Sequence, residues 1–225
     1  MKIDVKYLLI DQSHSWNNLS KYIKYISDER RQRIEHFVFE KDKIISLLAE
    51  LLTRYEIMTA LGIGNTAVRF SYNPFGKPHL YHFPNYHFSI SHTDGCIVFA
   101  GSDRIVGIDT EKIAAYDPDI AHHFFVPQEI KFIDESKNKD FAFYDIWTKK
   151  ESYLKMLGTG LSKPLQSFNV LSDELSKKFT TKKFPNHMIT LCTDYTANGN
   201  CKIIFNEIKI YNLLELFDNY QNESI

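Results

Sequence analysis

Glycine and proline are scarce in this chain, with 9 and 7 examples among 225 residues. Disordered segments are usually rich in such residues and poor in apolar ones, whereas 44% of the residues here are hydrophobic. We therefore expect no long disordered linker. The length allows either one large domain or two smaller lobes, each with a buried core.

An excess of charge of one sign is also missing, because 27 Lys and Arg residues balance 28 Asp and Glu residues. A protein that binds nucleic acid normally carries a basic excess or a basic stripe. Nucleic acid is therefore not expected as the main partner. One local group of basic residues is interpreted as a solvated loop or helix face: Lys177, Lys178, Lys182 and Lys183.

Cysteine is rare, and long apolar runs are absent. The three cysteines, Cys96, Cys192 and Cys201, form no CxxC pair, so we expect reduced and mostly buried thiols. The first apolar run is too short for a secretion signal and is interrupted by charges. No stretch approaches the roughly 20 apolar residues of a transmembrane helix. These absences predict a cytoplasmic protein with no membrane partner.

The spacing of apolar residues predicts helices, then strands, then helices and strands again. Helices are expected after a cap at Ser27, from about residue 40 to Gly62, near residue 120, from Pro127, and over about 140–157 before Gly158. Strands are expected at 2–10, 68–72, 86–91, 96–100, 105–109, 167–171, 188–193 and 201–210. This order predicts an α+β fold with two lobes of similar size, residues 1–103 and 104–225.

Two acidic residues follow one of these strands. Asp109 and Glu111 lie two apart at the end of the apolar run 105–108, so both carboxylates point to the same face. Like charges this close usually require a cation or a proton, and carboxylate oxygens are ligands that Mg²⁺ prefers. Taken alone, the pair is better explained as two solvated acids at a strand end.

A third acid, Glu151, lies in the helix predicted at 140–157, with Lys155 one turn later. By itself this is an ordinary surface pair that contributes little to stability. The three acids together form a longer pattern, Val106-Gly107-Ile108-Asp109-Thr110-Glu111 and then, some forty residues on, Trp147-Thr148-Lys149-Lys150-Glu151-Ser152-Tyr153-Leu154-Lys155.

This pattern resembles the signature of the Sfp-type phosphopantetheinyl transferases. In that family a hydrophobic-Gly-hydrophobic-Asp-x-Glu strand precedes Trp-x-x-Lys-Glu-x-x-x-Lys on a helix. The resemblance covers about residues 20–170. Further segments that are similar to the family are residues 26–33, Ser46 with Arg54, Gly76-Lys77-Pro78, residues 88–92, Phe124-Phe125 and residues 158–162.

The resemblance implies an activity and a fold. The chain would transfer the phosphopantetheine arm of coenzyme A to a serine of an apo acyl or peptidyl carrier protein, with Mg²⁺, and release 3′,5′-ADP. Two lobes related by a pseudo-two-fold axis would each contain a small antiparallel sheet with packed helices. Residues 1–103 would bind coenzyme A and residues 104–225 would carry the metal and catalytic residues. A chain of this length would act as a monomer.

The resemblance also implies roles for individual residues. Glu151 would take the serine proton, directly or through a metal-bound water, and Lys155 would stabilise the departing phosphate. Lys150 would steady the nucleophile or the pyrophosphate. The metal ligands would be Asp109, Glu111 and Glu151, and the coenzyme A site would consist of Arg30, Arg33, Ser46, Lys77, Pro78, Ser91, His92, Lys150 and Lys155.

Two other functions agree with parts of the pattern. A metal-dependent phosphate hydrolase could use the same three acids, and it would release phosphate or nucleotide without a carrier. A non-catalytic module could bind coenzyme A or the carrier. The complete set Asp109, Glu111, Glu151 and Lys155 argues against the module, because a binder does not need a whole metal site.

Overall fold

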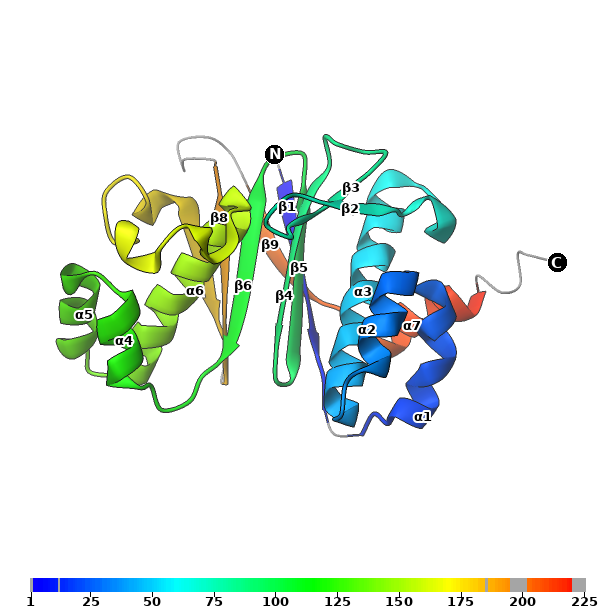
Figure 1. Cartoon of the computed structure of the whole chain (residues 1–225), viewed down its shortest axis with the longest axis horizontal. Coiled ribbons are helices and arrows are strands. Elements are labelled where there is room, and N and C mark those ends of the chain that lie inside the picture. The colour runs from blue at the N-terminus through cyan, green and yellow to red at the C-terminus, as the bar shows by residue number, and fades with distance from the viewer. Residues whose placement is uncertain (1, 12, 185, 195–201, 220–225) are drawn as a thin grey trace.

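The computed structural model describes residues 2–11, 13–184, 186–194 and 202–219 (Figure 1). The fold is α+β, as predicted. A four-stranded sheet has the order β4-β5-β1-β9, a three-stranded sheet has the order β6-β8-β7, and β2 pairs with β3. The strands are β1 Lys2–Leu9, β2 Phe70–Tyr72, β3 Pro78–Leu80, β4 His87–Thr93, β5 Cys96–Ser102, β6 Val106–Lys112, β7 Phe179–Lys183, β8 His187–Thr193 and β9 Lys202–Glu207.

Helices cover the outer side of each sheet, and the strands meet at the centre of the molecule (Figure 1). No helix in the described part of the chain is both long and apolar enough to span a membrane. The first group of helices comprises α1 Trp16–Leu19, α2 Asp28–Glu35, α3 Glu40–Leu61 and α7 Ile210–Asn219. The second group comprises α4 Pro118–Phe124, α5 Pro127–Asp134 and α6 Lys139–Leu157.

The two sheets share a hydrophobic core. Val5 on β1, Val98 on β5, Ile108 on β6 and Leu191 on β8 are completely buried in one cluster. This cluster contains residues of strands from both lobes. Burial of their apolar surface therefore stabilises the contact between the lobes. Strands β4 and β6 lie side by side (Figure 1), and the hydroxyl group of Ser91 on β4 donates a hydrogen bond to Asp109 on β6.

The helix signals in the sequence are confirmed. The Ser27 hydroxyl oxygen accepts a hydrogen bond from the backbone N–H of Arg30, as expected for a helix cap. Helix α6 ends at Gly158, whose φ of 70° lies in the left-handed region that favours glycine. The region before residue 62 likewise forms one long helix, α3, with an almost entirely buried face.

The strand expected at 167–171 is wrong. Leu165–Ser167 forms a 3₁₀ turn, and irregular backbone follows it. The backbone groups of this segment bind buried charges instead of a neighbouring strand. The carbonyl oxygens of Leu165 and Phe168 accept hydrogen bonds from Lys150 Nζ, and the N–H of Val170 donates to Glu129. Val170 is buried, whereas Phe168 and Leu171 are partly buried, and the contacts of this segment are ones that no short-range signal reveals.

The carboxyl-terminal segment returns to the first lobe. Strand β9 pairs in parallel with β1, so that Ile3 lies opposite Ile203, and the sheet is mixed instead of purely antiparallel. Leu213 and Phe217 of α7 are buried in the same core as α3. The strand expected at 201–210 ends at Glu207, and a helix follows it. Residues 202–219 therefore pack with the first lobe, although they lie beyond the predicted boundary at 103.

The cysteine prediction is confirmed for two of the three residues. Cys96 and Cys192 are free and buried, and burial raises their pKa values to about 11 and about 12. Neither thiol therefore has the lowered pKa of a reactive cysteine. Cys201 lies outside the described residues.

The lysines grouped near residue 180 do not form a helix face. Lys177 and Lys178 lie in a 3₁₀ turn, and Lys182 and Lys183 lie on strand β7. The ammonium group of Lys183 lies 3.4 Å from the centre of the Phe141 ring, so this side chain packs along an aromatic surface.

Glu56 on α3 provides a test of how burial affects stability. It is 9% exposed, and burial raises its pKa from 4.5 to about 7, with a smaller opposing effect of Lys6. Since the folded protein holds this proton more tightly than the unfolded chain does, the stabilisation is present below pH 4.5 and is lost as the pH rises through 7. Across that range, wild-type stability should fall by about 3 kcal/mol relative to Glu56→Gln. Urea unfolding checks this, and parallel pH profiles would contradict it.

Candidate active site

Gly107 brings the two elements that carry the acids into contact. A Cβ atom at this position of β6 would overlap the carbonyl oxygen of Ser152 and the backbone nitrogen of Met156 on α6. Any side chain here would push the helix away from the strand. The glycine therefore lets α6 place Glu151 and Lys155 next to the strand that carries Asp109.

Asp109 lies at the centre of the site and is 3% exposed. Its Oδ1 atom accepts hydrogen bonds from Lys155 Nζ at 2.7 Å and from Ser91 Oγ at 2.8 Å. Its Oδ2 atom is buried and has no hydrogen-bond partner among the described residues. An unpaired buried carboxylate oxygen is energetically unfavourable, so this atom is suited to receive a ligand.

The other two acids interact electrostatically with Asp109. Burial raises the pKa of Glu111 to about 7, and the negative charge of Asp109 adds to the effect. Burial also raises the pKa of Glu151, again with Asp109 as the second cause. Lys155 opposes both shifts. At neutral pH the positive charge of Lys155 therefore compensates the repulsion among the three acids only in part. Binding of a further cation or a proton would compensate the rest.

The donor set fits a hard divalent cation in its chemistry. Carboxylate oxygens are ligands that Mg²⁺ prefers, and the unpaired Asp109 Oδ2 supplies one. Among the described residues, however, no three acidic, histidine or cysteine side chains already lie close enough to form a metal cluster. Glu111 and Glu151 would have to move toward Asp109 when a cation binds.

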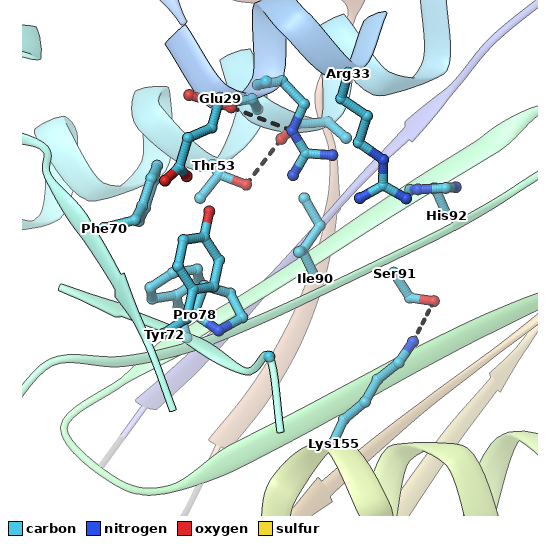
Figure 2. A pocket seen from close by; sticks show the side chains of 15 residues that line it. Glu29, Arg33, Thr53, Phe70, Tyr72, Pro78, Ile90, Ser91, His92 and Lys155 are labelled. Carbon is cyan, nitrogen blue, oxygen red and sulfur yellow. Dashed lines mark hydrogen bonds and ion pairs between the residues drawn. The ribbon is translucent and has the colours of Figure 1, made fainter. Parts of the chain in front are cut away.

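A pocket of about 490 Å³ lies beside the acids, between α2, α3, the β2–β3 pair and β4. Figure 2 shows Arg33 and His92 at one side of this pocket and Lys155, bonded to Ser91, at another. Tyr72, Phe70 and Pro78 form the opposite, more apolar wall. The pocket thus combines cationic groups with a surface on which a planar ring could pack.

The cation of Arg30 is held in place by an acid that the sequence analysis missed. Glu50 on α3 is buried and accepts from Arg30 Nε at 3.3 Å and from Arg54 Nε at 2.8 Å. Ser46 Oγ lies 3.5 Å from a second nitrogen of Arg30. The four-residue spacing of Glu50 and Arg54 is visible in the sequence, but the link to Arg30 requires the packing of α2 on α3.

His92 lies among cations at the edge of this pocket. Shielding from water lowers its pKa, and the positive charges of Lys155, Arg30 and Arg33 lower it further, whereas Asp42 opposes them. A second pocket of about 250 Å³ on the far side of Arg30 and Arg33 includes His92 and Ser46. The two pockets thus share Arg30, Arg33 and His92 in their walls.

Lys150 is the clearest correction to the predicted site. Its side chain is completely buried, and Nζ lies 2.8 Å from a carboxylate oxygen of Glu129 on α5. Its other hydrogen bonds go to the carbonyl oxygens of Leu165 and Phe168. These contacts point it into the core of the second lobe, away from Asp109. In this structure the ammonium group of Lys150 is therefore bound by Glu129 and two carbonyl groups, and it does not contact Asp109.

Lys77 differs from the prediction in a similar way. Its Nζ atom donates to the carbonyl oxygens of Met156 at 3.0 Å and Val106 at 3.3 Å. Burial lowers its pKa to about 8. The side chain therefore binds the second lobe, while its neighbours Gly76 and Pro78 line the pocket that contains Arg30 and His92.

The fold and the site define a 4′-phosphopantetheinyl transferase, and the chain belongs to that family. Residues 105–199 match the 4′-phosphopantetheinyl transferase superfamily, and residues 13–104 match the family described as 4′-phosphopantetheinyl transferase, N-terminal. The resemblance drawn from the sequence motifs is confirmed, and the chain is a transferase that acts on carrier proteins.

Individual relatives agree with this assignment. The chain is 32% identical to 4′-phosphopantetheinyl transferase Sfp of Bacillus subtilis (strain 168), over 72% of this chain and 74% of that protein. It is 34% identical to another 4′-phosphopantetheinyl transferase of Bacillus subtilis, over 76% of each chain. The L-aminoadipate-semialdehyde dehydrogenase-phosphopantetheinyl transferase of Schizosaccharomyces pombe is 32% identical, over 72% of this chain and 71% of that protein.

Proposed function

We propose that this protein transfers the 4′-phosphopantetheine moiety of coenzyme A to a serine of an apo acyl or peptidyl carrier protein and releases 3′,5′-ADP, with Mg²⁺. The observation that carries the proposal is Asp109, a buried carboxylate with one oxygen bound to Lys155 and the other unpaired. Asp109 lies beside a pocket that contains cationic groups of the first lobe.

The cations of the pocket suit the phosphates of coenzyme A. Arg30 and Arg33 occupy one face of α2, three residues apart, and His92 lies next to Arg33 (Figure 2). Guanidinium groups bind phosphate oxygens through two parallel hydrogen bonds. We assign the 3′-phosphate and the pyrophosphate to these groups, with Ser46 and Ser91 as hydroxyl donors and Pro78 in the wall.

The residues of the second lobe suit the transfer step. The serine oxygen would attack the phosphorus that carries pantetheine, and the bond from this phosphorus to the bridging oxygen would break. Glu151, whose pKa is raised by burial, would take the serine proton. Lys155 would neutralise charge on the leaving 3′,5′-ADP. When bound by Asp109, Glu111 and Glu151, Mg²⁺ would supply charge neutralisation at the phosphates.

The arrangement of the lobes supports further parts of the proposal. In this proposal residues 1–103 bind coenzyme A and residues 104–225 carry the acids, and one shared core holds the two parts together. Because one chain contains both parts, we propose that the protein acts as a monomer. We also propose that it acts in the cytoplasm on carrier proteins of peptide or polyketide synthesis.

A transfer assay tests this function. The protein is mixed with coenzyme A, Mg²⁺ and a panel of apo acyl and peptidyl carrier proteins, and intact-protein mass spectrometry follows the carriers. We expect at least one carrier to gain the mass of one phosphopantetheine group, and this gain should require Mg²⁺. Release of nucleotide from coenzyme A with every carrier unmodified would instead support the hydrolase, and binding of coenzyme A without any product would support the non-catalytic module.

A further inference from the structure

A tight loop of the first lobe reaches across to the second lobe at residues 73–77. The side-chain oxygen of Asn73 accepts hydrogen bonds from the backbone N–H groups of Phe75 and Lys77. The backbone N–H of Asn73 donates to the carbonyl oxygen of Lys77 at 3.0 Å. These bonds fix the loop so that the side chains of Asn73 and Lys77 point to the same place on the other lobe.

That place is the carboxyl-terminal end of α6. The last carbonyl groups of a helix have no partner inside it, and this end of the helix carries partial negative charge. Asn73 Nδ2 donates to the Gly158 carbonyl oxygen at 2.7 Å, and Lys77 Nζ donates to that of Met156 at 3.0 Å. The loop therefore satisfies two carbonyl groups at the end of α6 and places a cation there.

Lys77 also binds the strand that carries the acids. Its Nζ atom lies 3.3 Å from the carbonyl oxygen of Val106, the first residue of β6. The same strand continues to Asp109, and α6 carries Glu151 and Lys155. One ammonium group thus connects the pocket loop of the first lobe with both elements that hold the predicted catalytic side chains.

We propose that Lys77 is a positioning residue, which fixes the end of α6 and the start of β6 against the coenzyme A loop and so holds Glu151 and Asp109 in register with the bound substrate. This inference rests on the proposed function, and it gives Lys77 a role other than the direct contact with coenzyme A that the family resemblance implies. Because a small misplacement of reacting groups lowers the reaction rate strongly, loss of the Lys77 side chain should lower kcat.

Hydrogen exchange tests the structural part without any use of activity. Wild type, Lys77→Met, Lys77→Arg and the exposed control Lys137→Met are compared with no ligand present. In Lys77→Met we expect amide exchange in the last turn of α6 to be about tenfold faster, because the carbonyl groups there lose their cation. Lys77→Arg, which keeps a cation, and Lys137→Met should stay near wild type.

Kinetics with two substrates test the link to catalysis. 3′-Dephospho-coenzyme A lacks the 3′-phosphate, one of the two groups assigned above to Arg30, Arg33 and His92. We expect Lys77→Met to lower kcat about 10–100-fold while the ratio of the two KM values stays at the wild-type value. The comparison variant Arg33→Met should bring the two KM values closer together. Asn73→Ala, a second variant of the same loop, should act in the same direction as Lys77→Met.

The two measurements separate the possible failures. Unchanged exchange in Lys77→Met would overturn the positioning role, whatever the activity of the enzyme. A rise in KM for coenzyme A alone, with kcat unchanged, would overturn it in favour of a phosphate ligand. If wild type modifies no carrier, the proposed function fails, and the exchange data still decide whether Lys77 fixes the two elements.

Discussion

Replacing Glu151 with glutamine should lower transfer to the carrier at least about 10³-fold while the protein stays folded. The amide keeps the size of the side chain but can neither take a proton nor bind a cation as a carboxylate does. Glu151 is partly exposed, lines a separate pocket of about 270 Å³ with Lys155, and makes no contribution to the buried core between the sheets. Its loss should therefore lower kcat, and the neutral amide should leave the fold at least as stable at neutral pH, because burial and the charge of Asp109 raise the pKa of Glu151.

The measurement uses the mass assay on a modified carrier, with thermal unfolding followed in parallel. Glu174→Gln, which changes an exposed acid far along the chain, serves as the matched control and should keep wild-type turnover. If Glu151→Gln stays folded and retains more than about a tenth of the wild-type kcat, Glu151 is not the proton acceptor.

Replacing Glu129 with alanine should destabilise the protein by about 3–5 kcal/mol, because it leaves the ammonium group of Lys150 buried without its anion. Both side chains are completely buried. Glu129 also accepts hydrogen bonds from the backbone N–H groups of Val126 and Val170. Its removal therefore loosens the start of α5 and the segment after residue 165 as well. Urea unfolding followed by circular dichroism gives the change in free energy.

Two further variants make this test specific. Glu135→Ala breaks a pair with Lys131 in which both side chains are largely exposed, and its effect should stay below about 0.5 kcal/mol. The double variant Glu129→Leu with Lys150→Met removes both charges and should recover part of the lost stability. A double variant as unstable as Glu129→Ala would mean that the buried charge is not the cause.

Local signals in the sequence were sufficient for most helices and strands. The ends of α6 and α3 follow from glycines that adopt left-handed backbone, and α2 begins at a serine cap. Such signals depend on interactions between residues close in the sequence, so they can be recognised without knowledge of the tertiary structure. The family motifs added the arrangement of Asp109, Glu111 and Glu151, because they fix which strand and which helix approach each other.

The role given to Lys150 could have been corrected from helix geometry alone. Adjacent residues of an α-helix point about 100° apart, whereas residues four apart share a face. Glu151 and Lys155 can therefore face the same site, and Lys150 faces elsewhere. Its actual partner, Glu129, lies on a different helix, and sequence spacing contains no signal for that contact. The same reason explains why the link between Glu50 and Arg30 was missed.

The pairing of β9 with β1 has a consequence for how the protein assembles during its synthesis. Strand β1 is made long before β9, so one of its edges stays unpaired until residues 202–207 have been made. An open strand edge readily pairs with a foreign strand, and the buried face of α3 also lacks Leu213 and Phe217 until α7 has been made. The first lobe is thus exposed to aggregation while the residues between β1 and β9 are being made, and its folding is completed only once β9 and α7 have been made.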